Sequence, residues 1–139
     1  MMSDCIFCKI VAGELPSARV YEDETKLAFM DIGPVQPGHT LLIPKKHYER
    51  FTDLPDDLAA DLARVLPRLS RAVAGAADAD GFNLLQMNGA CAGQVVPHVH
   101  IHIIPRHEDD GYSFHWKAGA YAEGEMQEWQ RKIKEQLDA

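Results

Sequence analysis

The chain has 139 residues, of which 46% are hydrophobic and 25% are charged, enough for one globular domain with its own core. Its formal net charge of -7, from 21 acidic and 14 basic residues, argues against a general binder of nucleic acids or anionic membranes, so a phosphate ligand would need local donors such as backbone amides and histidines. No apolar run is as long as a transmembrane helix and no signal peptide opens the sequence, so we expect a cytoplasmic protein.

The first half of the chain predicts a short helical turn, three strands and a long helix. We expect the turn at 5–13 and the strands at 19–22, 26–30 and 39–44, the first two joined by a polar hairpin turn. Pro55 and the two aspartates after it are typical of a helix start. Helical spacing then gives one apolar face, formed by Leu58, Leu62, Val65, Leu66, Leu69 and Val73. Pro67 lies inside this pattern and predicts a kink or a local opening.

The second half predicts two more strands and a C-terminal helix. A strand at 81–87 is followed by a Gly/Ala loop, and a further strand begins at Val96 or His98 and ends at Ile104, before Pro105. A charged amphipathic helix is expected at 122–137. Short connections between most strands favour an antiparallel sheet, so the fold class is α+β, with about five strands, one long helix and one C-terminal helix. We expect a single domain over 1–139, its tail partly helical from about residue 108.

Three histidines alternate with aliphatic residues in His98-Val99-His100-Ile101-His102-Ile103-Ile104. Alternate residues of a strand share one face, so the three imidazoles should lie together while the aliphatic residues face the core. One such histidine would be an ordinary half-buried residue, but three in register would repel one another when protonated. The spacing therefore indicates a functional site, with metal binding favoured over catalysis.

The alternating segment matches the signature His-φ-His-φ-His-φ-φ, where φ is hydrophobic, and so resembles the histidine triad (HIT) family. Other segments resemble the same family in order and approximate spacing: Phe29-Met30-Asp31-Ile32, Pro37-Gly38-His39, Leu42-Ile43-Pro44-Lys45-Lys46-His47, Asn88-Gly89 and Ala92-Gly93-Gln94. The similarity runs from about Cys5 to His107. It implies a HIT-like fold of the bacterial type that carries an N-terminal Cys-x-x-Cys pair.

The resemblance implies a catalytic role for the middle histidine, His100. In the family this residue attacks the α-phosphorus of a nucleotide conjugate and forms a nucleotidyl-histidine intermediate. Water then releases the nucleoside monophosphate. Neutral imidazole suits this chemistry because it is available at pH 7 and is a good nucleophile. The family holds the other ring nitrogen with the backbone carbonyl of the first triad histidine, here His98. The third, His102, would hydrogen-bond the α-phosphate and stabilise the developing charge.

The loop before the triad is rich in small residues, which let backbone amides approach an anion closely. Alone it would read as a plain surface turn; the resemblance makes it the α-phosphate cradle, including Gly93. Asn88 resembles the family asparagine that contacts phosphate and ribose-side oxygens, and Gln94 resembles a catalytic-site glutamine on the leaving-group side. Val95 departs from eukaryotic purine-nucleotide members, which often carry Ser or Thr there, so only its backbone amide can help to hold the phosphate.

The nucleoside pocket is also inferred from the resemblance. Asp31 corresponds to the family residue that accepts hydrogen bonds from both ribose hydroxyls, although by itself it could equally be a turn-capping aspartate before Gly33. Phe29 and Ile32 would flank the base; without the resemblance they read as core or edge residues. His39 resembles a further active-site histidine near the phosphate, and its alternative is an edge-strand polar residue.

Cys5 and Cys8 form a C-x-x-C pair that could be redox-active, metal-binding or accidental. Their position at the start of the chain, with no preceding strand, disfavours a thioredoxin-like motif, and three cysteines in all argue against a disulfide framework. The resemblance supplies two further ligands, His47 and His98. A Cys₂His₂ set suits a structural tetrahedral Zn²⁺, which would pin the N-terminal segment beside the nucleophile's strand.

The resemblance thus predicts a nucleotide hydrolase that cleaves purine nucleoside phosphoramidates or related AMP conjugates. The alternatives are a dinucleoside polyphosphate hydrolase or nucleotidyltransferase, and a zinc-stabilised nucleotide-binding scaffold with little turnover. The expected ligand is a small-molecule nucleotide, with no nucleic acid and no membrane as partner. The family also implies a homodimer.

Overall fold

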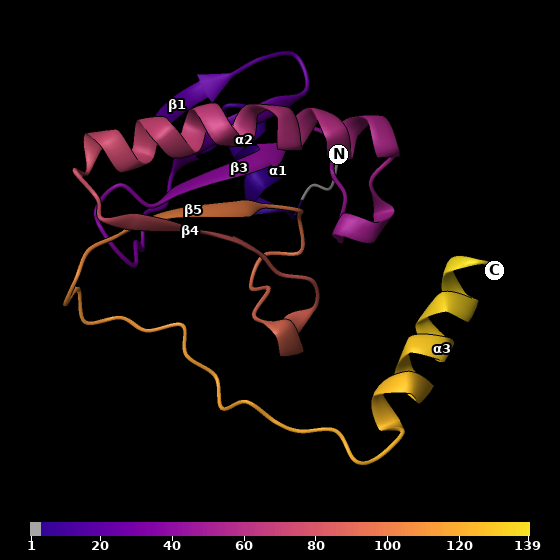
Figure 1. Ribbon diagram of the computed structural model, residues 1–139. Helices are drawn as coiled ribbons and strands as arrows, with labels where there is room; N and C mark the ends of the chain where they lie inside the picture. Colours follow the sequence, from indigo (N-terminus) through magenta and orange to yellow (C-terminus); the bar gives the residue numbers. More distant parts are fainter. Residues whose placement is uncertain (1–3) are drawn as a thin grey trace.

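The computed structural model describes residues 4–139 as an α+β fold built on one five-stranded antiparallel sheet (Figure 1). The sheet order is β1-β2-β3-β5-β4, and every neighbouring pair is antiparallel. Its strands are β1 (Arg19–Glu22), β2 (Lys26–Met30), β3 (Thr40–Pro44), β4 (Gly81–Gln86) and β5 (Ile101–Arg106). The helices are α1 (Ile6–Val11), α2 (Asp56–Ala76) and α3 (Glu125–Leu137). The predicted fold class is therefore confirmed.

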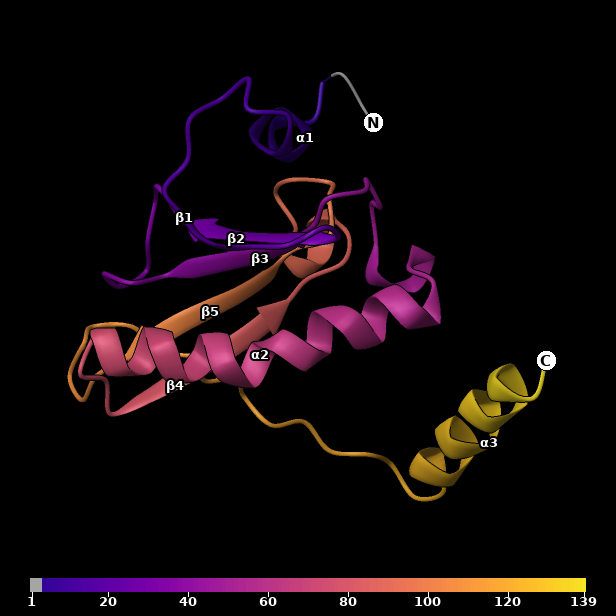
Figure 2. The same ribbon diagram turned by 90° about the horizontal axis from the view of Figure 1, so that it is seen from above.

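Helices α1 and α2 cover opposite faces of the sheet, as the view from above shows (Figure 2). Successive side chains of a strand point to opposite faces. In β3, Leu42 accordingly packs in the cluster that contains the α2 residues, while Leu41 and Ile43 pack in the cluster that contains Phe7 of α1. All five residues of β3 are buried for this reason. The central strands are thus packed on both faces, and the triad segment leads into one of them, β5.

The first hairpin is locked to α2 by a buried lysine. Asp23 Oδ1 accepts the backbone N–H groups of Thr25 and Lys26 at 2.9 and 3.0 Å, a turn geometry that aspartate favours. The Lys26 ammonium, whose side chain is only 6% exposed, lies 2.7 Å from Asp23 and 2.8 Å from Asp61 of α2. These hydrogen bonds lower the pKa of Asp61, and they join strand and helix on the face away from α1.

One prediction about prolines is wrong. β5 begins at Ile101, later than expected, and continues through Pro105 to Arg106. Because β3 pairs with β5 only from Ile101 to Ile103, no acceptor on that side needs the N–H that Pro105 lacks. Helix α2 continues across Pro67 as one element, without a local opening, because its buried face stabilises the helix past the single lost backbone hydrogen bond.

The C-terminal helix α3 lies away from the body of the domain at the end of an extended segment (Figures 1 and 2). Every residue from His115 to Ala139 is exposed. Its apolar side chains recur at spacings of three or four residues and so share one helix face: Met126, Trp129, Ile133 and Leu137. Among the described residues, none of the helices has the length and apolarity required to span a bilayer.

Candidate functional site

The imidazole of His100 is held in one tautomer by the backbone. Its Nδ1 lies 2.6 Å from the carbonyl oxygen of His98. A carbonyl can only accept, so Nδ1 carries the proton and Nε2 keeps a lone pair. His100 is only 6% exposed, and this burial lowers the pKa of its imidazole. The ring is therefore neutral at pH 7 and can act as a nucleophile through Nε2.

Only His102 lies within β5, yet the triad still alternates as predicted. The N–H of Val99 donates to the carbonyl of Tyr48 at 2.7 Å, which pairs the segment ahead of β5 with the chain after β3. Val99, Ile101 and Ile103 pack in the core cluster beneath α2. The rings of His98 and His100 instead lie 5.8 and 5.1 Å from Phe7 of α1, so the histidines face the opposite layer.

A pocket of about 580 Å³ opens beside His100 and His102. Its lining is mostly apolar, with two imidazoles, one carboxylate and the Ser17 hydroxyl as its polar side-chain groups, which is the usual composition of a small-molecule site. Seven of the residues expected to bind a nucleotide line it: Phe29, Asp31, Ile32, Gly93, Val95, His100 and His102. The side chains of Ile32 and Val95 are almost fully exposed, at 101% and 90%. They are free to cover a planar ligand.

One wall of the pocket comes from α1, which the sequence did not assign to ligand binding. Phe7 and Ile10 both line the pocket. The Phe7 ring lies edge-on to Phe29 at 5.5 Å and to His100 at 5.1 Å, so it packs against both of these pocket residues. Phe7 stands between the two cysteines of the C-x-x-C pair, and that placement is the only sequence signal that could have pointed to it.

The loop before the triad is braced by two side-chain amides. Gln94 Oε1 accepts the N–H of Gly89 at 2.7 Å, and Gln94 Nε2 donates to the carbonyl of Glu49 at 2.7 Å. Asn88 Oδ1 accepts the N–H of Phe51 at 2.7 Å. Both amides thus tie the loop to the segment that follows β3, and neither Asn88 nor Gln94 lines the pocket. Their hydrogen bonds hold the loop in place.

Asp31 and His39 stand next to the third triad histidine. Asp31 Oδ1 accepts the N–H of Gly33 at 2.8 Å, and its Oδ2 lies 3.5 Å from His39 Nε2. His39 Nε2 is also 2.9 Å from His102 Nδ1. Burial lowers the pKa of His39 and, together with the neighbouring His100 and His39, lowers the pKa of His102 to about 4. Both rings are therefore uncharged at pH 7.

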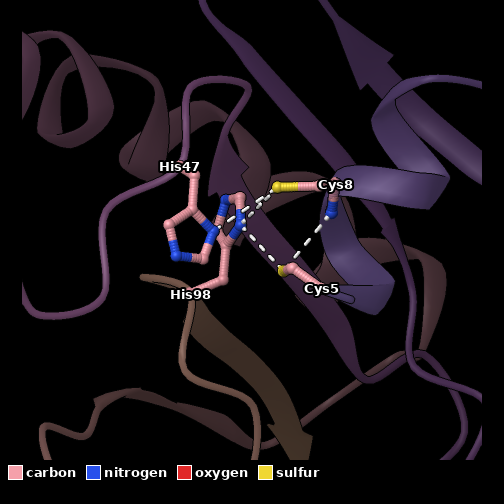
Figure 3. Close-up of side chains that lie close together, drawn as sticks. All are labelled: Cys5, Cys8, His47 and His98. Atoms are coloured by element: carbon pink, nitrogen blue, oxygen red, sulfur yellow. Dashed lines mark hydrogen bonds between the residues drawn. The ribbon is translucent and has the colours of Figure 1, made fainter. Parts of the chain in front are cut away.

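The four predicted metal ligands come together from three parts of the chain (Figure 3). Cys5 and Cys8 belong to the start of α1, His47 follows β3, and His98 precedes β5. Cys5 Sγ lies 3.4 Å from His98 Nδ1, and Cys8 Sγ lies 3.4 Å from His47 Nδ1 and 3.6 Å from His98 Nδ1. Cys91 is exposed and outside this cluster.

The chemistry of this cluster fits a tetrahedral metal ion. With ordinary zinc–sulfur and zinc–nitrogen bonds, the S···N edges of a tetrahedron are about 3.6 Å long, close to the distances between these side chains. His98 Nε2 lies 2.8 Å from the carbonyl oxygen of Pro44 and must donate to it. Nδ1 is then unprotonated and faces the sulfurs, the usual arrangement of a metal-ligating histidine. Cys5, Cys8, His47 and His98 can therefore hold a metal.

Comparisons with known proteins agree with this geometry. A family model described as "HIT domain" matches residues 12–109. Protein hit of Bacillus subtilis is 49% identical over 118 residues, covering 84% of this chain and 81% of that protein. An adenosine 5'-monophosphoramidase of Saccharomyces cerevisiae is 43% identical, covering 82% of this chain and 70% of its own length. An adenylylsulfatase of Arabidopsis thaliana is 46% identical, covering 79% of this chain and 56% of its own length.

Solved structures show the same fold. A crystal structure of a HIT family member from Bacillus subtilis superposes with a TM-score of 0.91 at 45% identity, covering 96% of both chains. A crystal structure described as a zinc-bound histidine triad family protein from Mycobacterium smegmatis gives a TM-score of 0.74 at 42% identity, covering 84% of both chains. The family model matches most of the chain, and relatives more than 40% identical to it align over more than three quarters of its length. The chain therefore belongs to the HIT family.

Proposed function

We propose that this protein is a nucleotide hydrolase that cleaves purine nucleoside phosphoramidates or related AMP conjugates at the α-phosphate. One observation carries the proposal: His100 is neutral, and its Nδ1–H is bonded to the His98 carbonyl, so Nε2 is left as a nucleophile. Relatives named as an adenosine 5'-monophosphoramidase and an adenylylsulfatase support an AMP conjugate as substrate. Both names share an adenylyl group and differ in the group that leaves.

The proposed reaction has two steps. His100 Nε2 donates its lone pair to the α-phosphorus, a P–N bond forms, and the bond to the leaving group breaks, with the departing amine taking up a proton from solvent. Water then attacks the same phosphorus and returns a proton to solvent, the bond to His100 breaks, and AMP leaves. The Nδ1–H bond to the His98 carbonyl stabilises the positive charge that the ring gains in the intermediate.

The pocket suggests how the nucleotide would lie. The base would rest between Phe29 and Ile32, the ribose hydroxyls would donate to Asp31, and the α-phosphate would lie between His102 and the loop at Gly93 and Val95. Valine at 95 offers no side-chain hydroxyl to the leaving group. We assign Asn88 and Gln94 to holding this loop, because their amides are already bonded to protein groups and would have to release them to reach a ligand.

Turnover and trapping of the intermediate test this function. We expect adenosine 5'-phosphoramidate to be hydrolysed, and acid quenching followed by mass spectrometry to find AMP on the peptide that contains His100. His100→Ala should abolish both signals while still binding AMP. His115→Ala, which removes an exposed imidazole far along the chain, is the matched control and should leave turnover unchanged. Faster cleavage of diadenosine polyphosphates would favour the alternative hydrolase class, and hydrolysis that survives His100→Ala would refute the assignment.

We further propose that the Cys5, Cys8, His47 and His98 cluster holds a structural Zn²⁺. The set is complete with four protein ligands, and a closed tetrahedral set stabilises a fold rather than activating water. A reducing compartment such as the cytoplasm would keep both cysteines reduced and able to bind a metal. We expect about one zinc per chain in protein prepared without chelator. Less than a tenth of that amount, with both thiols shown to be reduced, would contradict the site.

A homodimer is the proposed assembly. The apolar face of α3 is exposed along its whole length, with Trp129 at 49% and Ile133 at 57%, and burying such a face on a partner would stabilise it. β4 is also an edge strand with exposed Phe82 and Leu84. Sedimentation should give a dimer for the full chain. Phe82→Glu and Trp129→Glu test the two surfaces separately, and a monomeric full-length chain would refute the proposal.

A further inference from the structure

Asp31, His39 and His102 form a second cluster of ligand-type side chains, with one ligand atom from each lying within 4.8 Å of the other two. Two histidines and a carboxylate are a common set for a divalent metal. The same atoms could instead share a proton between the two imidazoles, because His39 Nε2 and His102 Nδ1 are 2.9 Å apart. The hydrogen-bond partner on the far side of His39 decides between these readings.

The backbone N–H of Val35 points at His39 Nδ1 from 3.1 Å. An N–H can only donate, so Nδ1 must be the acceptor, and the neutral ring carries its proton on Nε2. The Asp31 carboxylate, 3.5 Å from Nε2, independently favours a proton at that nitrogen. Two contacts on opposite ring nitrogens, from Val35 and from Asp31, thus select the same tautomer of His39.

This tautomer disfavours a metal ion in the cluster. A metal bound to His39 Nε2 would move the ring proton to Nδ1, where it would confront the Val35 N–H, and two donors would face each other without an acceptor. His98 shows the opposite arrangement, since its Nε2 donates to the Pro44 carbonyl and its Nδ1 lone pair faces the cysteines. The backbone contacts therefore favour metal binding in the cluster that contains His98 and a shared proton in the cluster that contains His39.

We propose that His39 is a positioning residue that fixes the tautomer of His102. Its Nε2–H donates to His102 Nδ1, so His102 keeps its own proton on Nε2, the ring nitrogen left for the pocket that it lines with His100. The chain of donors runs from the Val35 amide through His39 to His102. Only the identity of the group that receives the last N–H, the α-phosphate, rests on the proposed function.

The tautomer matters because an isolated neutral imidazole can place its proton on either nitrogen. With the proton on Nδ1, His102 would present a lone pair to a phosphate oxygen, and the two acceptors would repel. With the proton on Nε2, it presents a donor already oriented before the phosphate arrives. A fixed donor of this kind stabilises charge that develops on the phosphate oxygens without reorganisation.

Nitrogen NMR of the full-length, zinc-loaded protein tests the proposal without any substrate. The ¹⁵N shifts of the seven histidines separate protonated from unprotonated ring nitrogens, and variants at 39 and 102 assign the two signals. We expect both His39 and His102 to be neutral at pH 7.5 with the proton on Nε2. His39 protonated on Nδ1, or His102 protonated on Nδ1, would overturn the proposal.

Three variants test the consequence for catalysis. His39→Leu removes the donor to His102, whereas His39→Gln can place an amide N–H near the same position. Removing a direct oxyanion donor costs about 100-fold or more in kcat, and for this indirect loss we expect roughly 30-fold in His39→Leu, mostly in kcat rather than KM. His39→Gln should recover to within about threefold of the parent, and His115→Leu, the same change at an exposed site, should have no effect.

Equal loss in the Leu and Gln variants, with melting temperatures like the parent, would overturn the role of the donated hydrogen bond. If NMR shows the expected tautomers but the protein turns over no nucleotide, the hydrolase proposal is refuted and the positioning of His102 by His39 is upheld. Zinc titration adds an independent check. Saturation at one ion per chain is expected, and a second ion that is lost in His39→Gln would overturn the assignment of this cluster to a proton.

Discussion

Gly93→Ala should destabilise the protein through two separable effects. Gly93 has φ +94°, a left-handed conformation in which a non-glycine residue costs about 1–2 kcal/mol. A Cβ at this position would also lie 2.7 Å from Met87 Sδ, so the methionine must move. We estimate a total loss of about 2–3 kcal/mol in the free energy of unfolding, where the contact adds roughly 1 kcal/mol of overpacking. Urea unfolding followed by circular dichroism measures it.

Gly13 provides the matched control. Its φ of +78° carries the same backbone cost, yet nothing lies within 4 Å of a Cβ placed there. Gly13→Ala should therefore lose only the conformational part of the free energy of unfolding, about 1–2 kcal/mol. When Met87 is already alanine, the contact is gone, so adding Gly93→Ala to Met87→Ala should also cost only this conformational part. Equal losses in Gly93→Ala and Gly13→Ala would refute the contact, and no loss in either would refute the backbone argument.

Three further predictions concern charge and metal. Burial lowers the pKa of His100 below its usual value of 6.5, so the ring loses its proton at a lower pH than a free histidine does. The apparent pKa of the acid limb of kcat/KM should therefore lie below 6.5, and an apparent pKa at or above 6.5 would contradict the assignment. Chelation of zinc should lower the melting temperature, with a loss of about 3 kcal/mol if zinc had been present at 100 times its dissociation constant; identical melting of loaded and metal-free protein would refute a structural role. Lys26→Met should cost about 1–3 kcal/mol, since it removes the buried ammonium that two partly buried aspartates share. Lys45→Met, which removes a side chain that is 26% exposed, should cost less than about 1 kcal/mol by the same urea assay.

Local pattern was sufficient for most of the fold. β1 and β2 occupy the predicted residues, and α2 keeps the predicted apolar face. These elements have periodic burial or strong turn residues at their ends, which act over a few positions. The error at Pro105 arises because a neighbouring strand, which no local window of sequence contains, decides whether a missing N–H matters.

The candidate site, like the fold, could be predicted only in part from the sequence. The triad and the cysteine pair have spacings that few structural roles require, so they could be recognised from the sequence and from the family resemblance. The tasks of Gln94 and Asn88 could not, because their amides bond to Glu49 and Phe51, residues that only the folded chain brings near. Phe7 was missed for a related reason, since its role depends on where α1 docks.

Helix α1 contributes residues to both the cysteine–histidine cluster and the pocket. Its first turn carries Cys8 and the helix begins at Ile6, directly after Cys5, while Phe7 and Ile10 form a wall of the pocket. A metal bound to the cysteines would therefore fix the orientation of that wall, and metal and nucleotide would be thermodynamically coupled. The coupling must be reciprocal: if zinc tightens nucleotide binding by some factor, nucleotide tightens zinc binding by the same factor. Where zinc is scarce, nucleotide supply would then help to set how many molecules hold their metal.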